Sequence, residues 1–162
     1  MVDATSVIDY SYSDFCDGIK AIAEQVEASD FDPTYIVSIV RGGCVPGVYL
    51  SHRLKKPLVT VAWSTRDRNV YNNESNCWIP EDINILDKKI LLVDDIVDGG
   101  DTVKELLEDW QKSIAGVGKL NTDNIRIAAM WYNTAQDINV DFFHKTIDRN
   151  EDQRWVIFPW EA

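Results

Sequence analysis

The chain has 162 residues, 45% of them hydrophobic and 27% charged, which is the profile of a single soluble globular domain. Its formal net charge of −11 argues against a nucleic-acid-binding surface, because proteins that follow a phosphate backbone need a basic stripe. No apolar run approaches the roughly 20 residues that span a bilayer, and the N-terminus lacks the layout of a signal peptide, so we expect a cytoplasmic protein with no membrane partner. Its 3 cysteines, without CxxC spacing, argue against a disulfide framework or a structural zinc site.

The first third of the chain predicts a helix, a strand and a second helix. Apolar residues at helical spacing from Phe15 to Val26, after a capping Ser13, predict the first helix. The β-branched run 35–40 predicts a buried strand. A helix should follow from about Val45 to Leu54, with Pro46 in its first turn, where a missing N–H costs little.

The remainder continues the alternation of strands and helices. A polar stretch, 64–87, is long for a loop, and such loops are often lids or binding segments. A helix is predicted over 102–113. Further strands are expected at 58–63, 88–95 and 125–132, with weaker signals at 142–143 and 155–158.

This order predicts an α/β fold with a mainly parallel sheet. Ligands of such sheets bind outside the carboxyl ends of the strands. Two predicted strand ends carry unusual chemistry, namely Arg41-Gly42-Gly43 and Asp94-Asp95.

The segment 90–102 combines a buried strand, adjacent carboxylates, a glycine turn and a helix start. Glycines let backbone N–H groups curl around an anion, and the helix N-terminus suits a phosphate monoester. Thr102 can cap the helix or donate its hydroxyl to the phosphate. Adjacent carboxylates suit vicinal hydroxyls or a hard cation. Together these features describe a site for a phosphorylated sugar with free hydroxyls.

Other readings of this segment fit less well. A lone Asp-Asp or Gly-Gly would be an ordinary solvated turn, but the ordered set of elements makes that reading much weaker. The chain has no Walker A loop. A receiver domain also ends a strand in Val-Asp-Asp, yet it would do so near its start.

Segment 90–102 resembles the signature for 5-phosphoribosyl-1-pyrophosphate (PRPP) of the type I phosphoribosyltransferases. The segment 38–47 is similar to the pyrophosphate loop of xanthine-guanine phosphoribosyltransferases, and 155–161 to their base-stacking segment. The similarity covers most of residues 35–161. It implies one phosphoribosyltransferase domain over 1–162, with a flexible active-site loop (64–87) and a small C-terminal hood that binds the base (133–162).

The resemblance also implies an enzyme that transfers the phosphoribosyl group of PRPP to a purine base, giving a GMP-, XMP- or IMP-type product and pyrophosphate. It implies Mg²⁺ as cofactor, Asp98 as general acid/base, loop closure over the site and a homo-oligomer, dimer or tetramer. The ribose would be contacted by Asp94 and Asp95, and Mg²⁺ by Asp95. The 5-phosphate would be contacted by Asp98, Gly99, Gly100, Asp101 and Thr102, and the pyrophosphate by Arg41, Gly42 and Ser64. The base would be contacted by Trp155, Val156, Ile157 and Asn133.

The chain departs from the family pattern in two places. Gly99 stands where the family usually has Thr, and Asp101 replaces a small residue. Asn133 stands where enzymes for 6-oxopurines place a Lys that donates to O6. An Asn amide can donate and accept, so it suits a 6-oxo or a 6-amino base; it is equally typical of a turn after a strand.

Three functions therefore stay open. The leading one is a transferase for guanine, xanthine or hypoxanthine. The second is a regulator of the same fold that binds PRPP or a nucleotide and catalyses nothing. The third is a phosphoribosyltransferase for another base, such as adenine.

Overall fold

The computed structural model describes residues 6–65, 87–116 and 118–161, so the predicted active-site loop lies almost wholly outside the described residues. A parallel sheet has the order β3-β2-β4-β5-β6. Its strands are β2 (Tyr35–Val40), β3 (Leu58–Ala62), β4 (Ile90–Val97), β5 (Ile125–Asn133) and β6 (Phe142–Ile147).

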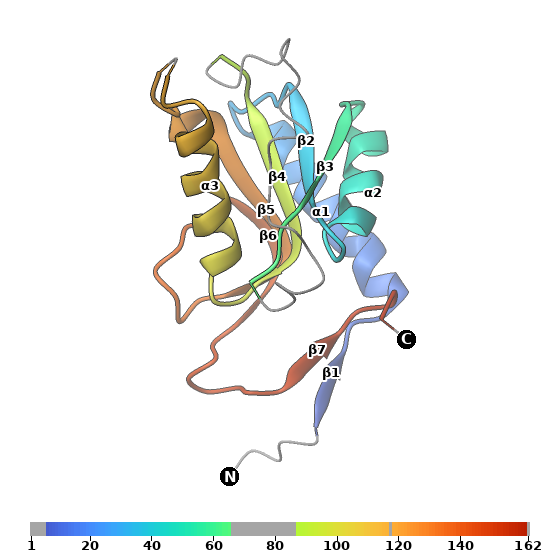
Figure 1. Cartoon of the computed structure of the whole chain (residues 1–162). Coiled ribbons are helices and arrows are strands. Elements are labelled where there is room, and N and C mark those ends of the chain that lie inside the picture. Colours follow the sequence, from blue (N-terminus) through green and yellow to red (C-terminus); the bar gives the residue numbers. More distant parts are fainter. Residues whose placement is uncertain (1–5, 66–86, 117, 162) are drawn as a thin grey trace.

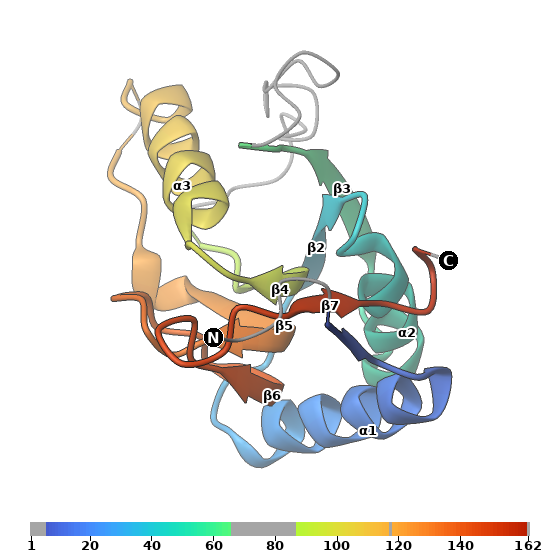
Figure 2. The ribbon, with the colours of Figure 1, turned by 90° about the horizontal axis from the view of Figure 1, so that it is seen from below.

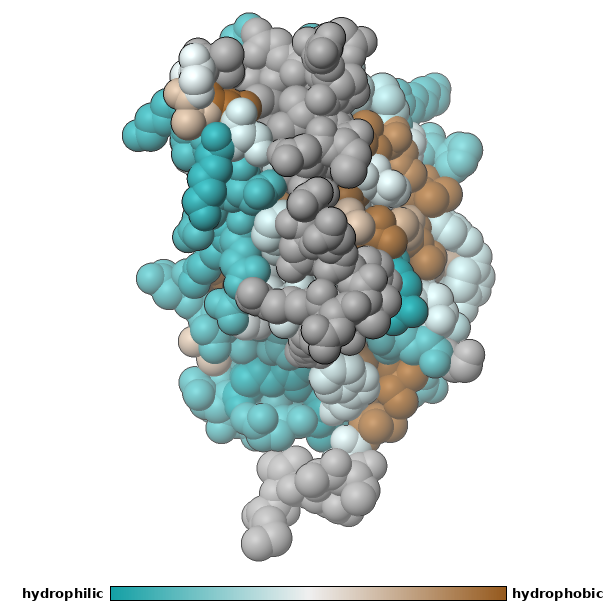
Figure 3. All heavy atoms as spheres, in the orientation of Figure 1, coloured by the Kyte–Doolittle hydropathy of each residue, from teal (hydrophilic) through white to brown (hydrophobic). Residues whose placement is uncertain are grey.

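Within the described ranges, three α-helices cover the two faces of this sheet. Helices α1 (Tyr12–Ala28) and α2 (Cys44–Leu54) lie on one face, and α3 (Asp101–Ser113) lies on the other (Figures 1 and 2). A short 3-10 helix, η1 (Thr122–Asn124), leads into β5. Figure 3 shows that hydrophilic side chains cover the α3 side of the molecule.

The sheet separates two hydrophobic clusters because alternate residues of a strand point to opposite faces. In β4, Leu91 and Val93 pack in the cluster with α1 and α2, whereas Ile90 and Leu92 pack in the cluster with α3. With both faces covered, β4 must be apolar at successive positions until it reaches its carboxyl end. The polar residues at that end are therefore placed for function rather than packing.

A second sheet has two strands, β1 (Val7–Asp9) and β7 (Trp155–Ile157), which pair in parallel. It lies below the main sheet in Figure 1, at the end where β4 turns into α3, and crosses in front of that end in Figure 2. The predicted hood, 133–162, therefore divides between two sheets, because β6 belongs to the main sheet and β7 pairs with the N-terminal β1.

Several predicted boundaries change. The first helix is capped by Ser11, not Ser13, because the Ser11 side chain accepts from the Asp14 N–H while Asp14 accepts from the Ser11 N–H. Helix α3 begins at Asp101, and its N-cap is Gly100, so the predicted capping role of Thr102 is wrong. In the part of the chain that the structure describes, no helix is long and apolar enough to cross a membrane.

Candidate functional site

A polar pocket of about 300 Å³ opens at the carboxyl ends of β2, β3 and β4 and the first turn of α3. Parallel strands bring these ends to one edge of the sheet, although they lie far apart in the sequence. The pocket is lined by all the residues predicted to contact PRPP: Arg41, Gly42, Ser64, Asp94, Asp95, Asp98, Gly99, Gly100, Asp101 and Thr102.

The loop after β2 presses directly on the end of β4. The Val40–Arg41 peptide bond is cis. At Gly42, an added Cβ would lie 2.0 Å from Asp95 Oδ2, and at Gly43 it would lie 2.5 Å from the Val93 carbonyl oxygen. Only glycine allows this approach, so the Arg41–Gly43 loop and the two carboxylates form one wall of the pocket.

The two adjacent carboxylates are held by backbone N–H groups. Asp94 Oδ1 accepts from the Asp95 N–H at 2.9 Å, and Asp95 Oδ1 accepts from the Ile96 N–H at 2.7 Å. Removal from water raises the pKa of Asp95; the hydrogen bonds from Ile96 and Asp94 work against this shift, and the nearby charge of Glu161 adds to it. Because burial makes the negative charge of Asp95 unfavourable, a cation bound next to this carboxylate would stabilise it.

The turn between β4 and α3 leaves the start of the helix open toward the pocket. Gly100 has a φ of 80°, a conformation that L side chains rarely adopt. No side chain caps α3. Because the first N–H groups of a helix have no partner within it, and Asp101, Thr102 and Val103 line the pocket, this helix end suits an anion.

A smaller pocket of about 110 Å³ shares Asp95, Ile96 and Asp98 with the polar pocket. Its other lining residues are Arg149, Trp155, Val156, Phe158 and Glu161. Trp155 lines this pocket and is 49% exposed. An indole ring is a surface on which a flat aromatic ring can stack.

Two residues predicted to contact the base line neither pocket. The Ile157 carbonyl accepts from the Tyr10 N–H at 2.9 Å. Asn133 is buried, with only 1% exposed, and its Nδ2 donates to the Asp98 carbonyl and to Asp98 Oδ1 at 3.1 and 3.3 Å.

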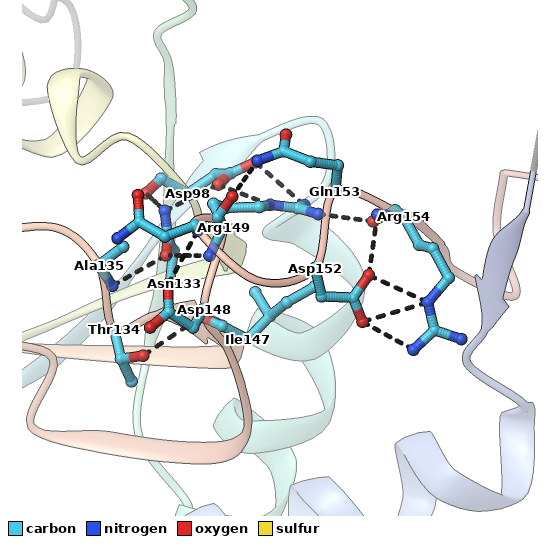
Figure 4. A network of polar contacts seen from close by, with 11 residues as sticks. Asp98, Asn133, Thr134, Ala135, Ile147, Asp148, Arg149, Asp152, Gln153 and Arg154 are labelled. Atoms are coloured by element: carbon cyan, nitrogen blue, oxygen red, sulfur yellow. Dashed lines mark hydrogen bonds and ion pairs between the residues drawn. The ribbon is translucent and has the colours of Figure 1, made fainter. Parts of the chain in front are cut away.

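The side-chain oxygen of Asn133 accepts from the N–H groups of Ala135 and Arg149, at 3.0 and 3.2 Å (Figure 4). Two donations and two acceptances fill the capacity of the amide. The direct contact predicted between Asn133 and a base therefore has no support in this arrangement; the residue holds Asp98 and the turn after β6.

Sequence reasoning missed Arg149, which comes from the turn after β6. Its Nε and Nη2 donate to the two carboxylate oxygens of Asp98 at 3.1 and 3.2 Å, and its Nη1 donates to the Arg154 carbonyl at 2.5 Å (Figure 4). The side chains of Arg149 and Asp98 are only 15% and 22% exposed. Recognising all of β6 would have placed Arg149 at a strand end.

The sequence pattern of the phosphoribosyl transferase domain matches residues 11–162, nearly the whole chain. The chain belongs to the phosphoribosyl transferase family. The predicted fold is confirmed, and so is the prediction that the chain is a type I phosphoribosyltransferase, an enzyme of the glycosyltransferase class.

Relatives of this phosphoribosyltransferase include purine enzymes. The hypoxanthine-guanine phosphoribosyltransferase of Schizosaccharomyces pombe is 24% identical over 184 residues, covering 94% of this chain and 88% of the relative. The solved purine phosphoribosyltransferase of Pyrococcus horikoshii has a TM-score of 0.71 at 25% identity, covering 96% of this chain and 94% of that one. The xanthine-guanine-hypoxanthine phosphoribosyltransferase of Helicobacter pylori has a TM-score of 0.72 at 25% identity, covering 97% and 95%.

Proposed function

We propose that this phosphoribosyltransferase transfers the 5-phosphoribosyl group of PRPP to guanine, xanthine or hypoxanthine. The observation that carries the proposal is the junction of the two pockets at Asp98. One pocket has the groups that a phosphorylated sugar requires, and the other is lined by a tryptophan, a residue on which a flat base can stack. The relatives named above support a purine as that base.

The polar pocket offers a partner to each part of PRPP. The first turn of α3 faces the 5-phosphate with its backbone N–H groups, and Thr102 adds a hydroxyl. The Asp94–Asp95 carboxylates accept from the ribose hydroxyls. Arg41 and the backbone of Gly42 meet the pyrophosphate together with Ser64, so they stabilise the charge that develops on the leaving group.

The base stacks on Trp155 and attacks C1 of the ribose through a ring nitrogen. The bond between C1 and the pyrophosphate oxygen breaks, a bond between C1 and that nitrogen forms, and the base must lose a proton. Asp98 lines both pockets and accepts that proton. Holding both reactants at this junction supplies the orientation that the transfer needs.

Mg²⁺ fits the carboxylates of the polar pocket. Within the described ranges, no group of three or more His, Cys, Asp or Glu side chains could hold a metal ion by itself. The raised pKa of Asp95 nevertheless marks a carboxylate that a cation would stabilise. We therefore propose that Asp95, with Asp94 beside it, would hold Mg²⁺, which would supply positive charge to stabilise the leaving pyrophosphate.

The test is turnover by the purified protein with PRPP, Mg²⁺ and a panel of purine and pyrimidine bases, followed as pyrophosphate release. Asp98→Asn should lower turnover by roughly a hundredfold or more while PRPP affinity stays within about twofold. Asp123→Asn, an exposed acid in η1, is the matched control. Tight PRPP binding without turnover of any base would refute the enzyme and favour the regulator; turnover of adenine alone would refute the proposed base.

A further inference from the structure

We infer that Arg149 selects the base, by donating to the exocyclic oxygen of a 6-oxopurine while Asp98 accepts the ring proton. The inference rests on the proposed function and deepens it, because it assigns base choice to a residue of the predicted hood that was not among the predicted base contacts. It begins from Arg149, which lines the smaller pocket together with Trp155.

The hydrogen bonds of Arg149 leave part of its guanidinium unused. The group carries five N–H bonds, and it can only donate. Three of them reach acceptors, two on the Asp98 carboxylate and one on the Arg154 carbonyl. One N–H on Nη1 and one on Nη2 remain without an acceptor among the residues that the structure describes, and they form the end of the guanidinium fork.

These two N–H groups, the unused fork, belong to the Arg149 side chain, which is held in place and mostly buried. Asp98 holds the guanidinium with two bonds, so the Arg149 side chain loses little additional freedom when it binds a ligand. Its 15% exposure limits access of water to the fork. A ligand acceptor at this place therefore satisfies donors that the described residues leave without an acceptor.

Arg149 presents a hydrogen-bond donor next to the acceptor oxygens of Asp98. A 6-oxopurine has a matching edge, since its exocyclic oxygen accepts and its N7, when it carries the proton, donates. The 6-amino group of adenine is a donor and would face the N–H groups of Arg149. Of the described residues that line the smaller pocket, Arg149 is the one cation, and Asn133 has its amide fully engaged. Discrimination at position 6 of the base thus belongs to Arg149.

The experiment compares hypoxanthine with unsubstituted purine, which lacks the exocyclic oxygen and the N1 proton that accompanies it. The wild-type protein should prefer hypoxanthine by roughly 10- to 100-fold in kcat/KM, the usual range for a good pair of hydrogen bonds to a base. In Arg149→Met, which keeps length but has no donor, this preference should fall to about 2-fold or less. Arg149→Lys, which retains a cation without the fork, should give an intermediate preference.

Asn133→Ala is the control for a purely structural role, because it loosens both Asp98 and the turn that carries Arg149 while the guanidinium donors stay in place. It should lower turnover of both bases alike and keep the preference for hypoxanthine. A merely structural role of Arg149 would make its variants behave like this control. An unchanged preference in Arg149→Met, with thermal unfolding close to that of the wild-type protein, would overturn the inference.

A second measurement separates this inference from the proposed function. Inosine monophosphate and its analogue without the exocyclic oxygen are titrated against the same variants by calorimetry. If the wild-type protein turns over no base but binds the first nucleotide more tightly in an Arg149-dependent way, the enzyme proposal fails and the base-selecting role holds. If the two nucleotides bind equally to the wild-type protein, the role of Arg149 fails whatever the turnover.

Discussion

Three glycine-to-alanine variants separate binding from stability at the wall of the polar pocket. In Gly42→Ala, the new methyl group would lie 2.0 Å from Asp95 Oδ2 and 2.4 Å from its Cγ. Rotation of the Asp95 side chain relieves this clash at the loss of the hydrogen bond from the Ile96 N–H. That loss costs about 1 kcal/mol, or roughly 2–4 °C in Tm for a domain of this size.

The same rotation removes Asp95 from its place in the pocket. We therefore expect Gly42→Ala to weaken PRPP binding by about tenfold or more, which is ~1.4 kcal/mol. In Gly43→Ala, the methyl group meets the carbonyl oxygens of Val93 and Ile39 at 2.5 and 2.7 Å. Backbone atoms of two strands cannot rotate away, so this variant should lose about 1–3 kcal/mol of stability.

Gly116→Ala is the control, because its added methyl group meets nothing within 4 Å. Its stability should stay within about 0.5 kcal/mol of the wild-type value. Thermal unfolding gives the stability of each variant, and calorimetric titration with PRPP and Mg²⁺ gives the affinity. If Gly42→Ala were as unstable as Gly43→Ala and kept full affinity for PRPP, rotation of Asp95 would be refuted.

Asp95→Asn should abolish Mg²⁺-dependent PRPP binding and raise the Tm of the ligand-free protein at about pH 7.5. The reason is that the pKa of Asp95 is raised in the folded protein, so ionisation of this carboxyl group costs stability as pH rises through that pKa. The increase in Tm should therefore become smaller as pH falls toward about 4. Burial lowers the pKa of His144, which shares a hydrogen bond with the Tyr10 hydroxyl. Protonation of His144 therefore opposes folding. Below about pH 6.5, the Tm of the wild-type protein should fall more steeply than the Tm of His144→Gln.

The central strands could be predicted closely because their signal is local. The strand predicted over 35–40 has the bounds of β2, since a strand buried on both faces reads as one apolar run. Strand β6 was recognised only at 142–143 because its second half, His144 to Thr146, is polar. Strand β1 has 3 residues and pairs with β7 at the other end of the chain, so no local pattern could reveal it.

Part of the candidate site could likewise be predicted from local sequence, and part could not. The segment 90–102 carries its chemistry in consecutive residues, so the phosphate-binding turn and its carboxylates could be read directly. The Asp98–Asn133–Arg149 network joins the last residue of β5 to residues just beyond the ends of β4 and β6, and only the order β4-β5-β6 brings them together. Asn133 read alone suggested a base contact, whereas its neighbours show that its amide is already engaged.

The polar pocket is acidic for a site that binds a polyanion. Four aspartates line it, Asp94, Asp95, Asp98 and Asp101, and Arg41 is the one cation among its described lining residues. Arg149 forms an ion pair with Asp98. Two unit charges 4 Å apart interact by about 4 kcal/mol at an effective dielectric constant of 20, and the charge of Arg41 with the partial charge of the α3 N-terminus is smaller than that of the other three aspartates.

This balance predicts an unusual dependence on salt. Monovalent salt screens repulsion between PRPP and the acidic pocket, so affinity at saturating Mg²⁺ should stay constant or rise between about 0.05 and 0.5 M salt. A site built on a basic patch would lose affinity over that range. Calorimetric titration along the series distinguishes the two, and a steep loss of affinity would mean that cations other than Arg41 carry the binding of PRPP.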